Sequence, residues 1–133
     1  MKINIGDQFA VTRTISDQLI RSFAELSGDR NPIHLDEGFA STTRFGRRIA
    51  HGMLSGALIS SVLGNEFAEE KIVYLSQTMR FVAPVFVGDT ITVTATVASI
   101  REDKPIVTVT TVCSNQDGET TMTGEAAVMF LDE

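Results

Sequence analysis

The stretch "RIAHGMLSGALISSVLG", residues 48–64, carries no acidic or basic side chain after Arg48 except the titratable His51. Large apolar side chains lie on every side of the helix that this stretch predicts, and glycine, alanine and serine occupy the positions between them. A helix that lacks a charged face is buried on most sides. Small residues on such a helix also let neighbouring backbone approach closely. We therefore expect this helix to lie at the centre of the protein.

The second half of the chain changes to the alternation that is typical of β-strands. "GDTITVTATVASI", residues 88–100, alternates threonine with apolar residues, and residues 105–131 contain two more strands of this kind. In residues 72–85 the same alternation places Val73 and Leu75 on the face that also carries the later apolar side chains of that strand.

Two turn signals separate the last three of these strands. "REDKP", residues 101–105, is the first, and Asn115–Gly118, with its asparagine, aspartate and glycine, is the second and stronger one. Strands that follow each other through short turns pair antiparallel. The expected result is one long antiparallel sheet.

The N-terminal part predicts a strand followed by short helices. Residues 2–13 are typical of an opening strand, and "SDQLIRSFAELSGD", residues 16–29, predicts an amphipathic helix that its first serine can cap. Asn31-Pro32 then requires an extended or turn conformation. A short helix is expected around residues 36–42.

One apolar helix and one long antiparallel sheet have a simple packing solution, in which the sheet curls around the helix. This α+β arrangement is the hot-dog fold, here with an extra helical segment that carries the active-site loop. We expect residues 1–133 to form a single domain of this kind. An exposed sheet face or edge is then covered by a second subunit, so a homodimer, or a higher homo-oligomer built from dimers, is expected.

The composition narrows the possible partners and locations. The formal net charge is −6, with no tryptophan and one tyrosine, which argues against nucleic acid and against an anionic membrane surface as partners. The single cysteine, Cys113, cannot form an internal disulfide. The N-terminal residues lack the apolar region of a signal peptide. A soluble, cytoplasmic protein is the expectation.

Both histidines of the chain lie in one stretch, "GDRNPIHLDEGFASTTRFGRRIAHGM", residues 28–53. Asp29 and His34 flank the rigid turn at Pro32, so their side chains can converge on one point. A histidine that titrates near neutral pH and a carboxylate acceptor suit paired proton transfer. The ordinary alternatives are an aspartate that binds turn amides and a histidine on the surface.

The central helix begins beside this stretch, at "AHGM". The first amides of a helix have no intrahelical acceptor, and Gly52 permits a ligand to approach the backbone. A carbonyl oxygen that becomes an enolate would be stabilised there, as in an oxyanion hole. Two histidines without a cysteine pair or the usual ligand spacing make a metal site an unfavoured reading, so no metal is expected.

These residues resemble the R-specific enoyl-CoA hydratases, or MaoC-like hydratases. The resemblance lies in an aspartate, Asn-Pro and a histidine followed by Leu-Asp, with His-Gly-Met about 16 residues further on. "LSQTMRFVAPVFVGD", "REDKP" and "TGEAAVMF" are similar to the later strands and loops of that family. The resemblance covers nearly the whole chain.

The resemblance implies a hot-dog dimer that reversibly hydrates trans-2-enoyl-CoA to (R)-3-hydroxyacyl-CoA without a metal or redox cofactor. It implies that Asp29 and His34 hold one water, that one of them acts as base, and that its partner returns a proton to the α carbon. The Gly52 N–H would polarise the thioester carbonyl.

Further residues are candidates for binding the acyl-CoA substrate. The candidates in the site are Ser60, Gln77, Met53, Leu63, Arg101 and Lys104, and Leu54 and Val128 are two more for an acyl pocket. Each also has an ordinary reading: helix back-bonding for the serine, a buried backbone partner for the glutamine, and core packing for the apolar residues. Further basic candidates for the phosphates of CoA are Arg44, Arg47, Arg48 and Arg80. His51 is interpreted as a structural hydrogen-bonding residue, with a second base as the alternative.

Two other functions stay open. A hot-dog thioesterase would attack the carbonyl, commonly with a carboxylate on or near the central helix, but residues 52–64 contain no aspartate or glutamate. A non-catalytic module that binds acyl-CoA or an acyl carrier would make the Asp29 and His34 pair incidental.

Overall fold

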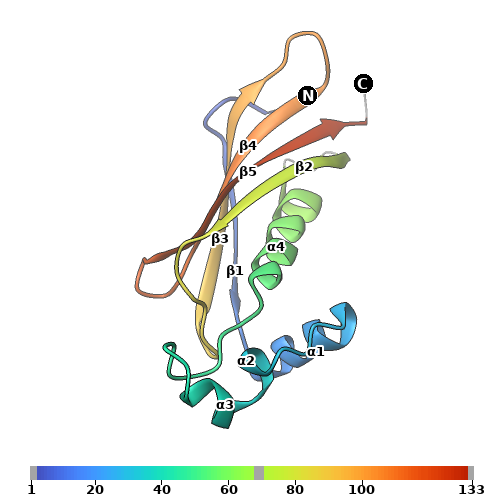
Figure 1. Cartoon of the computed structure of the whole chain (residues 1–133). Helices are drawn as coiled ribbons and strands as arrows, with labels where there is room; N and C mark the ends of the chain where they lie inside the picture. Colours follow the sequence, from blue (N-terminus) through green and yellow to red (C-terminus); the bar gives the residue numbers. More distant parts are fainter. Residues whose placement is uncertain (1–2, 68–70, 132–133) are drawn as a thin grey trace.

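The computed structural model describes residues 3–67 and 71–131, and Figure 1 shows their arrangement. One strand precedes the helices and four strands follow them, which is the order that the sequence predicts. The elements are β1 (Gln8–Thr14), α1 (Asp17–Ser27), α2 (Pro32–Leu35), α3 (Glu37–Ser41), α4 (Gly52–Ser61), η1 (Val62–Glu66), β2 (Ile72–Phe81), β3 (Thr90–Ile100), β4 (Ile106–Ser114) and β5 (Thr120–Phe130). The segment η1 is one turn of π-helix that continues α4. The opening strand is shorter than predicted, and residue 2 of that prediction lies outside the described residues.

The strands form one antiparallel sheet in the order β1-β3-β4-β5-β2. β3, β4 and β5 follow each other as the predicted meander. The turn before β5 is the predicted hairpin, since the Gly118 N–H donates to the Asn115 carbonyl at 3.0 Å and Gly118 has a φ of 78°. This positive φ is the conformation that a glycine adopts without strain.

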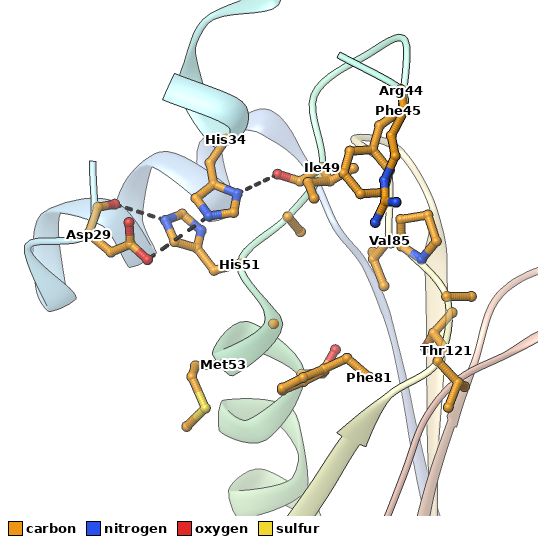
Figure 2. Close-up of a pocket in the computed structure, with 16 residues that line it drawn as sticks. Asp29, His34, Arg44, Phe45, Ile49, His51, Met53, Phe81, Val85 and Thr121 are labelled. Atoms are coloured by element: carbon orange, nitrogen blue, oxygen red, sulfur yellow. Dashed lines mark hydrogen bonds and ion pairs between the residues drawn. The ribbon is translucent and has the colours of Figure 1, made fainter. Parts of the chain in front are cut away.

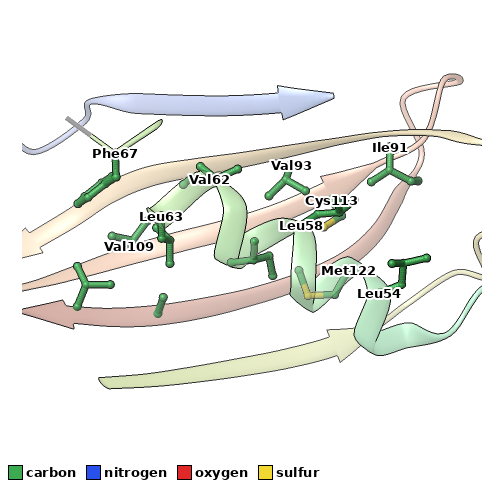
Figure 3. Close-up of a cluster of buried hydrophobic side chains, with 14 of the residues drawn as sticks. Leu54, Leu58, Val62, Leu63, Phe67, Ile91, Val93, Val109, Cys113 and Met122 are labelled. Carbon is green, nitrogen blue, oxygen red and sulfur yellow. The ribbon is translucent and has the colours of Figure 1, made fainter. Parts of the chain in front are cut away.

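The sheet curves around α4, and the core lies between them (Figures 1 and 3). The four inward residues of β3, predicted from its alternation, are all buried: Ile91, Val93, Ala95 and Val97. They meet Leu54 and Leu58 of α4, which are 4% and 5% exposed. The hot-dog fold expected from the sequence is therefore confirmed.

In the single chain, α4 is less enclosed than its sequence predicts. Ile49 precedes the helix and forms an isolated β-bridge with Phe86. Met53 is 53% exposed, and Ala57 and Ser60 on the same side of α4 are exposed as well. The sheet covers one side of the helix, and nothing in the described chain covers the side with the small residues.

The predicted faces of β2 need a correction at Leu75. A β-bulge lies between Tyr74 and Ser76, so that Tyr74 pairs with Val128 and Ser76 pairs with the next residue of β5. The extra residue reverses the alternation. Val73 and Leu75, predicted on the inner face, are 39% and 47% exposed, and Tyr74, which pairs with the buried Val128, is 36% exposed.

Polar contacts determine the start and end of the N-terminal helices. The Ser16 hydroxyl accepts from the Leu19 N–H at 3.1 Å at the start of α1, and Gly28 ends it with a φ of 80°. Asn31 caps α2, whose first residue is Pro32, as expected for a proline that has no N–H to satisfy. No helix among the described residues is long and apolar enough to cross a membrane.

Candidate active site

The Asp29 side chain has one oxygen in the turn and one directed toward His34. Its Oδ1 accepts from the Asn31 N–H at 3.1 Å, which is the turn contact that the ordinary reading of this residue expects. Its Oδ2 lies 4.0 Å from His34 Nε2, and the side chain is 51% exposed. The turn contact therefore orients the carboxylate and leaves its second oxygen available.

The orientation of His34 is determined by a backbone carbonyl. Its Nδ1 lies 2.8 Å from the Ile49 carbonyl oxygen, which can only accept, so Nδ1 carries the hydrogen. In the neutral ring Nε2 is then unprotonated and directed toward Asp29. The separation of 4.0 Å between Nε2 and Oδ2 is too long for a direct hydrogen bond. It leaves both atoms able to contact one shared water or substrate hydroxyl.

The surroundings of His34 favour this neutral form. Its side chain is 10% exposed. Burial lowers the pKa of His34 below its ordinary value, and the neighbouring His51 lowers it further, while the Ile49 carbonyl and Asp29 act in the opposite direction. A neutral imidazole with a free Nε2 can accept a proton at neutral pH.

His51 contacts both members of this pair. Its Nε2 lies 2.9 Å from the Asp29 carbonyl oxygen, and its ring stacks on the His34 ring with 3.9 Å between centroids and 28° between planes. Figure 2 shows the two rings one over the other, between Asp29 and Ile49. His51 is 3% exposed, and Phe23 packs against it at 4.9 Å.

Gly52 begins α4 directly after His51, which is the N-cap residue. None of the described residues accepts a hydrogen bond from the Gly52 N–H. The space beside its Cα is occupied by the chain itself, because a Cβ there would lie 3.0 Å from the Phe81 ring. A larger residue at position 52 would therefore require the Phe81 ring to shift, in addition to blocking the ligand approach that the sequence suggests.

These residues border a cavity of about 530 Å³. The Asp29 and His34 pair, called the dyad below, lies on one side of this cavity. Apolar side chains make up much of the rest (Figure 2). The lining residues are Asp29, His34, Arg44, Phe45, Ile49, Ala50, His51, Gly52, Met53, Ser55, Phe81, Val82, Ala83, Pro84, Val85 and Thr121. A mostly apolar cavity with a few convergent polar groups is typical of a small-molecule site.

Ten of the lining residues were not among the sequence candidates, and Phe81, Val82, Ser55 and Thr121 are four of these ten. Phe81 and Val82 are 51% and 50% exposed, an unusual state for two adjacent large apolar residues at a strand end. Ser55 and Thr121 are buried hydroxyl residues. Only the packing of α4 on β5 brings these two together, so spacing in the sequence contains no signal for them.

Cys113 lies beneath this cavity, in β4, and is fully buried. Burial raises the pKa of its thiol to about 11, against a smaller opposite effect of the Ser55 hydroxyl. A thiol with so high a pKa is a poor nucleophile at neutral pH. Cys113 is therefore not a candidate nucleophile for this site.

The structure does not bring most of the predicted substrate-binding residues to this cavity. Met53 lines it, but Leu63 is fully buried in the core and Ser60 is exposed further along α4. Arg101 and Lys104 lie in the β3–β4 turn, at the end of the sheet away from α2 (Figure 1). Arg101 forms an ion pair with Asp103 at 2.7 Å. Leu54 and Val128, the two further acyl-pocket candidates, belong to the hydrophobic core.

Gln77 has protein partners for its side-chain amide. Its Nε2 donates to the Thr78 carbonyl at 2.8 Å and to the Thr111 hydroxyl at 3.0 Å, and the Tyr74 hydroxyl donates to its Oε1. Within the chain, the Gln77 side chain therefore bonds to protein groups. This is the ordinary reading of Gln77 from the sequence, the alternative to a contact with substrate.

The basic cluster of the sequence separates into three environments. Arg44 is exposed and lines the cavity. Arg47 stacks on the Phe86 ring, with 3.8 Å from its Cζ to the ring centroid. Arg48 is buried and donates to the His34 carbonyl at 2.7 Å and to the Asp17 carboxylate at 2.6 Å. Arg48 therefore joins α2 to α1 and is not free to bind a phosphate, while Arg80 of β2 is exposed and does not line the cavity.

Asp29, His34 and His51 each offer an atom that could bind a metal, and these atoms lie within 4.8 Å of one another. Two facts favour proton chemistry over a metal here. Nδ1 of His34 and Nε2 of His51 already contact carbonyl oxygens, and the two rings stack on each other at 3.9 Å between centroids. The expectation of no metal stays a prediction.

Comparison with known proteins agrees with the family resemblance of the sequence motifs. Residues 4–118 match the model of the MaoC-like domain family. The chain is 43% identical over 126 residues to the (R)-specific enoyl-CoA hydratase of Aeromonas caviae, covering 95% of this chain and 94% of that protein. It is 44% identical over 127 residues to the (R)-specific enoyl-CoA hydratase of Rhodospirillum rubrum, covering 96% and 88%.

The fold agrees with solved structures as well. The (R)-hydratase from A. caviae involved in PHA biosynthesis matches with a TM-score of 0.94 at 42% identity, covering 98% of both chains.

Proposed function

Because the chain belongs to the MaoC-like domain family, we propose that it is an (R)-specific enoyl-CoA hydratase, a lyase that reversibly adds water to trans-2-enoyl-CoA. The observation that carries this proposal is the geometry of the dyad. Asp29 Oδ2 and His34 Nε2 lie 4.0 Å apart on one wall of an apolar cavity, beside the first amide of α4.

We assign the proton transfer to the one free nitrogen of His34. Its Nδ1 is held on the Ile49 carbonyl, so the ring exchanges protons only through Nε2. Nε2 takes a proton from the water whose oxygen forms the new bond to the β carbon. The Asp29 carboxylate orients this water and stabilises the imidazolium. The pair then returns the proton to the α carbon, and the product is a 3-hydroxyacyl thioester with no net proton gained or lost.

Gly52 supplies the electrostatic part of the proposed mechanism. As the water oxygen bonds to the β carbon, the electron pair of the double bond shifts toward the α carbon and the thioester oxygen, where negative charge develops. The Gly52 N–H has no acceptor among the described residues, and the N-terminus of α4 is partially positive. A single oxyanion donor of this kind accelerates a reaction by roughly 10²–10³-fold.

Absorbance measurements with crotonyl-CoA test this reaction directly. Hydration removes the absorbance of the conjugated enoyl thioester without release of a thiol. Release of free thiol would instead indicate a thioesterase, and binding without either change would indicate a non-catalytic module. α4 contains no aspartate or glutamate, and the carboxylate that lines the cavity is Asp29, so the first outcome is expected.

For the carrier of the acyl group we propose Arg44 as the first contact. It is exposed at the cavity and no described acidic side chain pairs with it. The phosphates of CoA are suitable partners for an unpaired guanidinium. Arg101 and Lys104 are distant from this cavity within one chain, so a role for them requires a second subunit.

We also propose that the protein forms the homodimer expected from its sequence, with a second copy on the α4 and β2 surface. A groove there is lined by Met53, Gly56, Tyr74, Leu75, Ser76, Gln77 and Met79. β2 is an edge strand, and a second copy presents the same edge. Sedimentation should therefore give a dimer, and Leu75→Lys should shift it to monomer. A monomeric wild-type protein would contradict this assignment. The cytoplasmic location stays a prediction from the sequence.

A further inference from the structure

His51 is placed where it can determine the distance between the two catalytic side chains. It contacts the Asp29 backbone through Nε2 at 2.9 Å and the His34 ring by stacking at 3.9 Å, and it is followed by Gly52 at the start of α4. The three groups that the proposed reaction uses therefore meet at this one buried residue. His51 has no side-chain hydrogen bond to the helix that it precedes, so helix capping does not explain its imidazole.

The hydrogen-bond partner of His51 determines its tautomer. The Asp29 carbonyl can only accept, so Nε2 of His51 carries the hydrogen. A neutral ring then leaves Nδ1 unprotonated, and this atom is buried without a hydrogen-bond partner among the described residues. His51 therefore acts as a donor through Nε2, and its Nδ1 faces no hydrogen-bonding group among the described residues.

We propose that His51 is a positioning residue of the hydration reaction, and that it acts through its hydrogen bond to the Asp29 carbonyl. This bond holds the Asp29 turn against the His34 ring, so that the carboxylate and Nε2 of His34 face the same water. The residue itself exchanges no proton with substrate. The proposal extends the sequence interpretation of His51 as a structural residue and excludes its alternative as a second base. It rests on the proposed hydratase function.

Three variants separate the hydrogen bond from the ring. His51→Gln keeps an amide N–H at about the reach of Nε2 and removes the ring. His51→Phe keeps a ring that can stack on His34 and removes the donor. His51→Asn is a shorter donor that does not reach the Asp29 carbonyl, and it replaces the phenylalanine variant if that one fails to fold. Ser16→Ala is the control, because it removes the α1 cap and Ser16 does not line the cavity.

The expected result is a difference in kcat with little change in KM. His51→Gln should retain kcat within about threefold, whereas His51→Phe and His51→Asn should lose about 10- to 100-fold, the size that a misplacement of about 1 Å produces. A purely structural role would lower thermal stability, as Ser16→Ala should, and leave kcat per folded molecule unchanged.

Equal losses in His51→Gln and His51→Phe, or no loss in any variant, would overturn the proposal. Imidazole ¹⁵N NMR of the wild-type protein gives a second test that does not depend on turnover. It should show His51 with hydrogen on Nε2 and His34 with hydrogen on Nδ1. Hydrogen on Nδ1 of His51 would reject the positioning bond even if crotonyl-CoA is not a substrate, and so distinguishes this failure from failure of the proposed reaction.

Discussion

The two parts of this molecule are held together by different forces. The sheet and α4 share an apolar core in which the side chains from Ile91 to Val97 that face inward are almost completely buried. The segment α1–α3 carries the turn with Asp29 and His34. It packs apolar side chains such as Ile20 into the same core, and polar contacts fix its position in addition: helix caps, the buried Arg48 and the two stacked histidines. Apolar packing tolerates small shifts, whereas hydrogen bonds specify atom positions. The comparison therefore predicts that stability and catalytic geometry can be changed separately.

The largest expected effect is on catalysis in the polar part. Asp29→Asn should lower turnover by at least about 100-fold, because the amide cannot supply the negative charge that a general acid–base pair requires. The fold should persist, since the new Oδ1 can still accept from the Asn31 N–H. Steady-state hydration of crotonyl-CoA and thermal unfolding measure the two effects.

Asp36→Asn is the matched control for this change. Asp36 caps α3 by accepting from the Phe39 N–H at 3.0 Å, and asparagine caps about as well. Activity of Asp29→Asn near that of the control would remove the carboxylate from the mechanism. His34→Ala should likewise lose more turnover than His51→Ala, and the reverse order would transfer the role of base to His51.

The next effect is on stability in the apolar part. Leu58→Ala should lower the free energy of unfolding by about 2–5 kcal/mol, because Leu58 is 5% exposed in the core and its truncation leaves a cavity. Turnover per folded molecule should stay near wild type. Leu26→Ala, at a position 84% exposed, should change stability by less than about 0.5 kcal/mol. Similar unfolding curves for both variants would mean that the core does not hold the fold as described.

Arg48→Met should change both stability and turnover, because Arg48 joins α1 to α2, the helix that carries His34. It removes a charged donor from the His34 carbonyl and from Asp17, and hydrogen bonds to charged groups contribute about 1.5–3 kcal/mol each. Both stability and kcat should fall. Arg21→Met removes the exposed partner of the same carboxylate and should change stability by about 0.3–0.5 kcal/mol and kcat not at all. Equal effects of the two variants would contradict the role of Arg48.

The smallest expected effect is the pH dependence. The folded pKa of His34 lies below its ordinary value, so the unfolded chain binds more protons between the two values. The contribution of His34 to the free energy of unfolding is therefore complete above its unfolded pKa of about 6.5. It is lost as the pH falls toward the folded pKa. Hydration should fall over the acidic end of this window, as Nε2 becomes protonated. His34→Gln should remove this part of the stability profile, and a profile that keeps its shape would assign the dependence to another group.

Much of the fold could be predicted from the sequence because it depends on periodicity. Alternation in β3 and the uncharged stretch of α4 each specify a buried face whatever their neighbours are. The exception was β2, where one extra residue at Leu75 reversed the faces. A bulge leaves the composition of a strand unchanged, so a periodicity count cannot locate it.

The catalytic pair could also be proposed from the sequence, since Asp29, Pro32 and His34 lie within one rigid turn and their approach is a local matter. What the tertiary structure alone decided was how this pair is held. Ile49 determines the tautomer of His34, and His51 contacts both members from 17 residues beyond His34, the difference between positions 51 and 34. Spacing along a chain specifies contacts within a turn, but contacts between a turn and the start of a distant helix depend on how the two pack against the sheet.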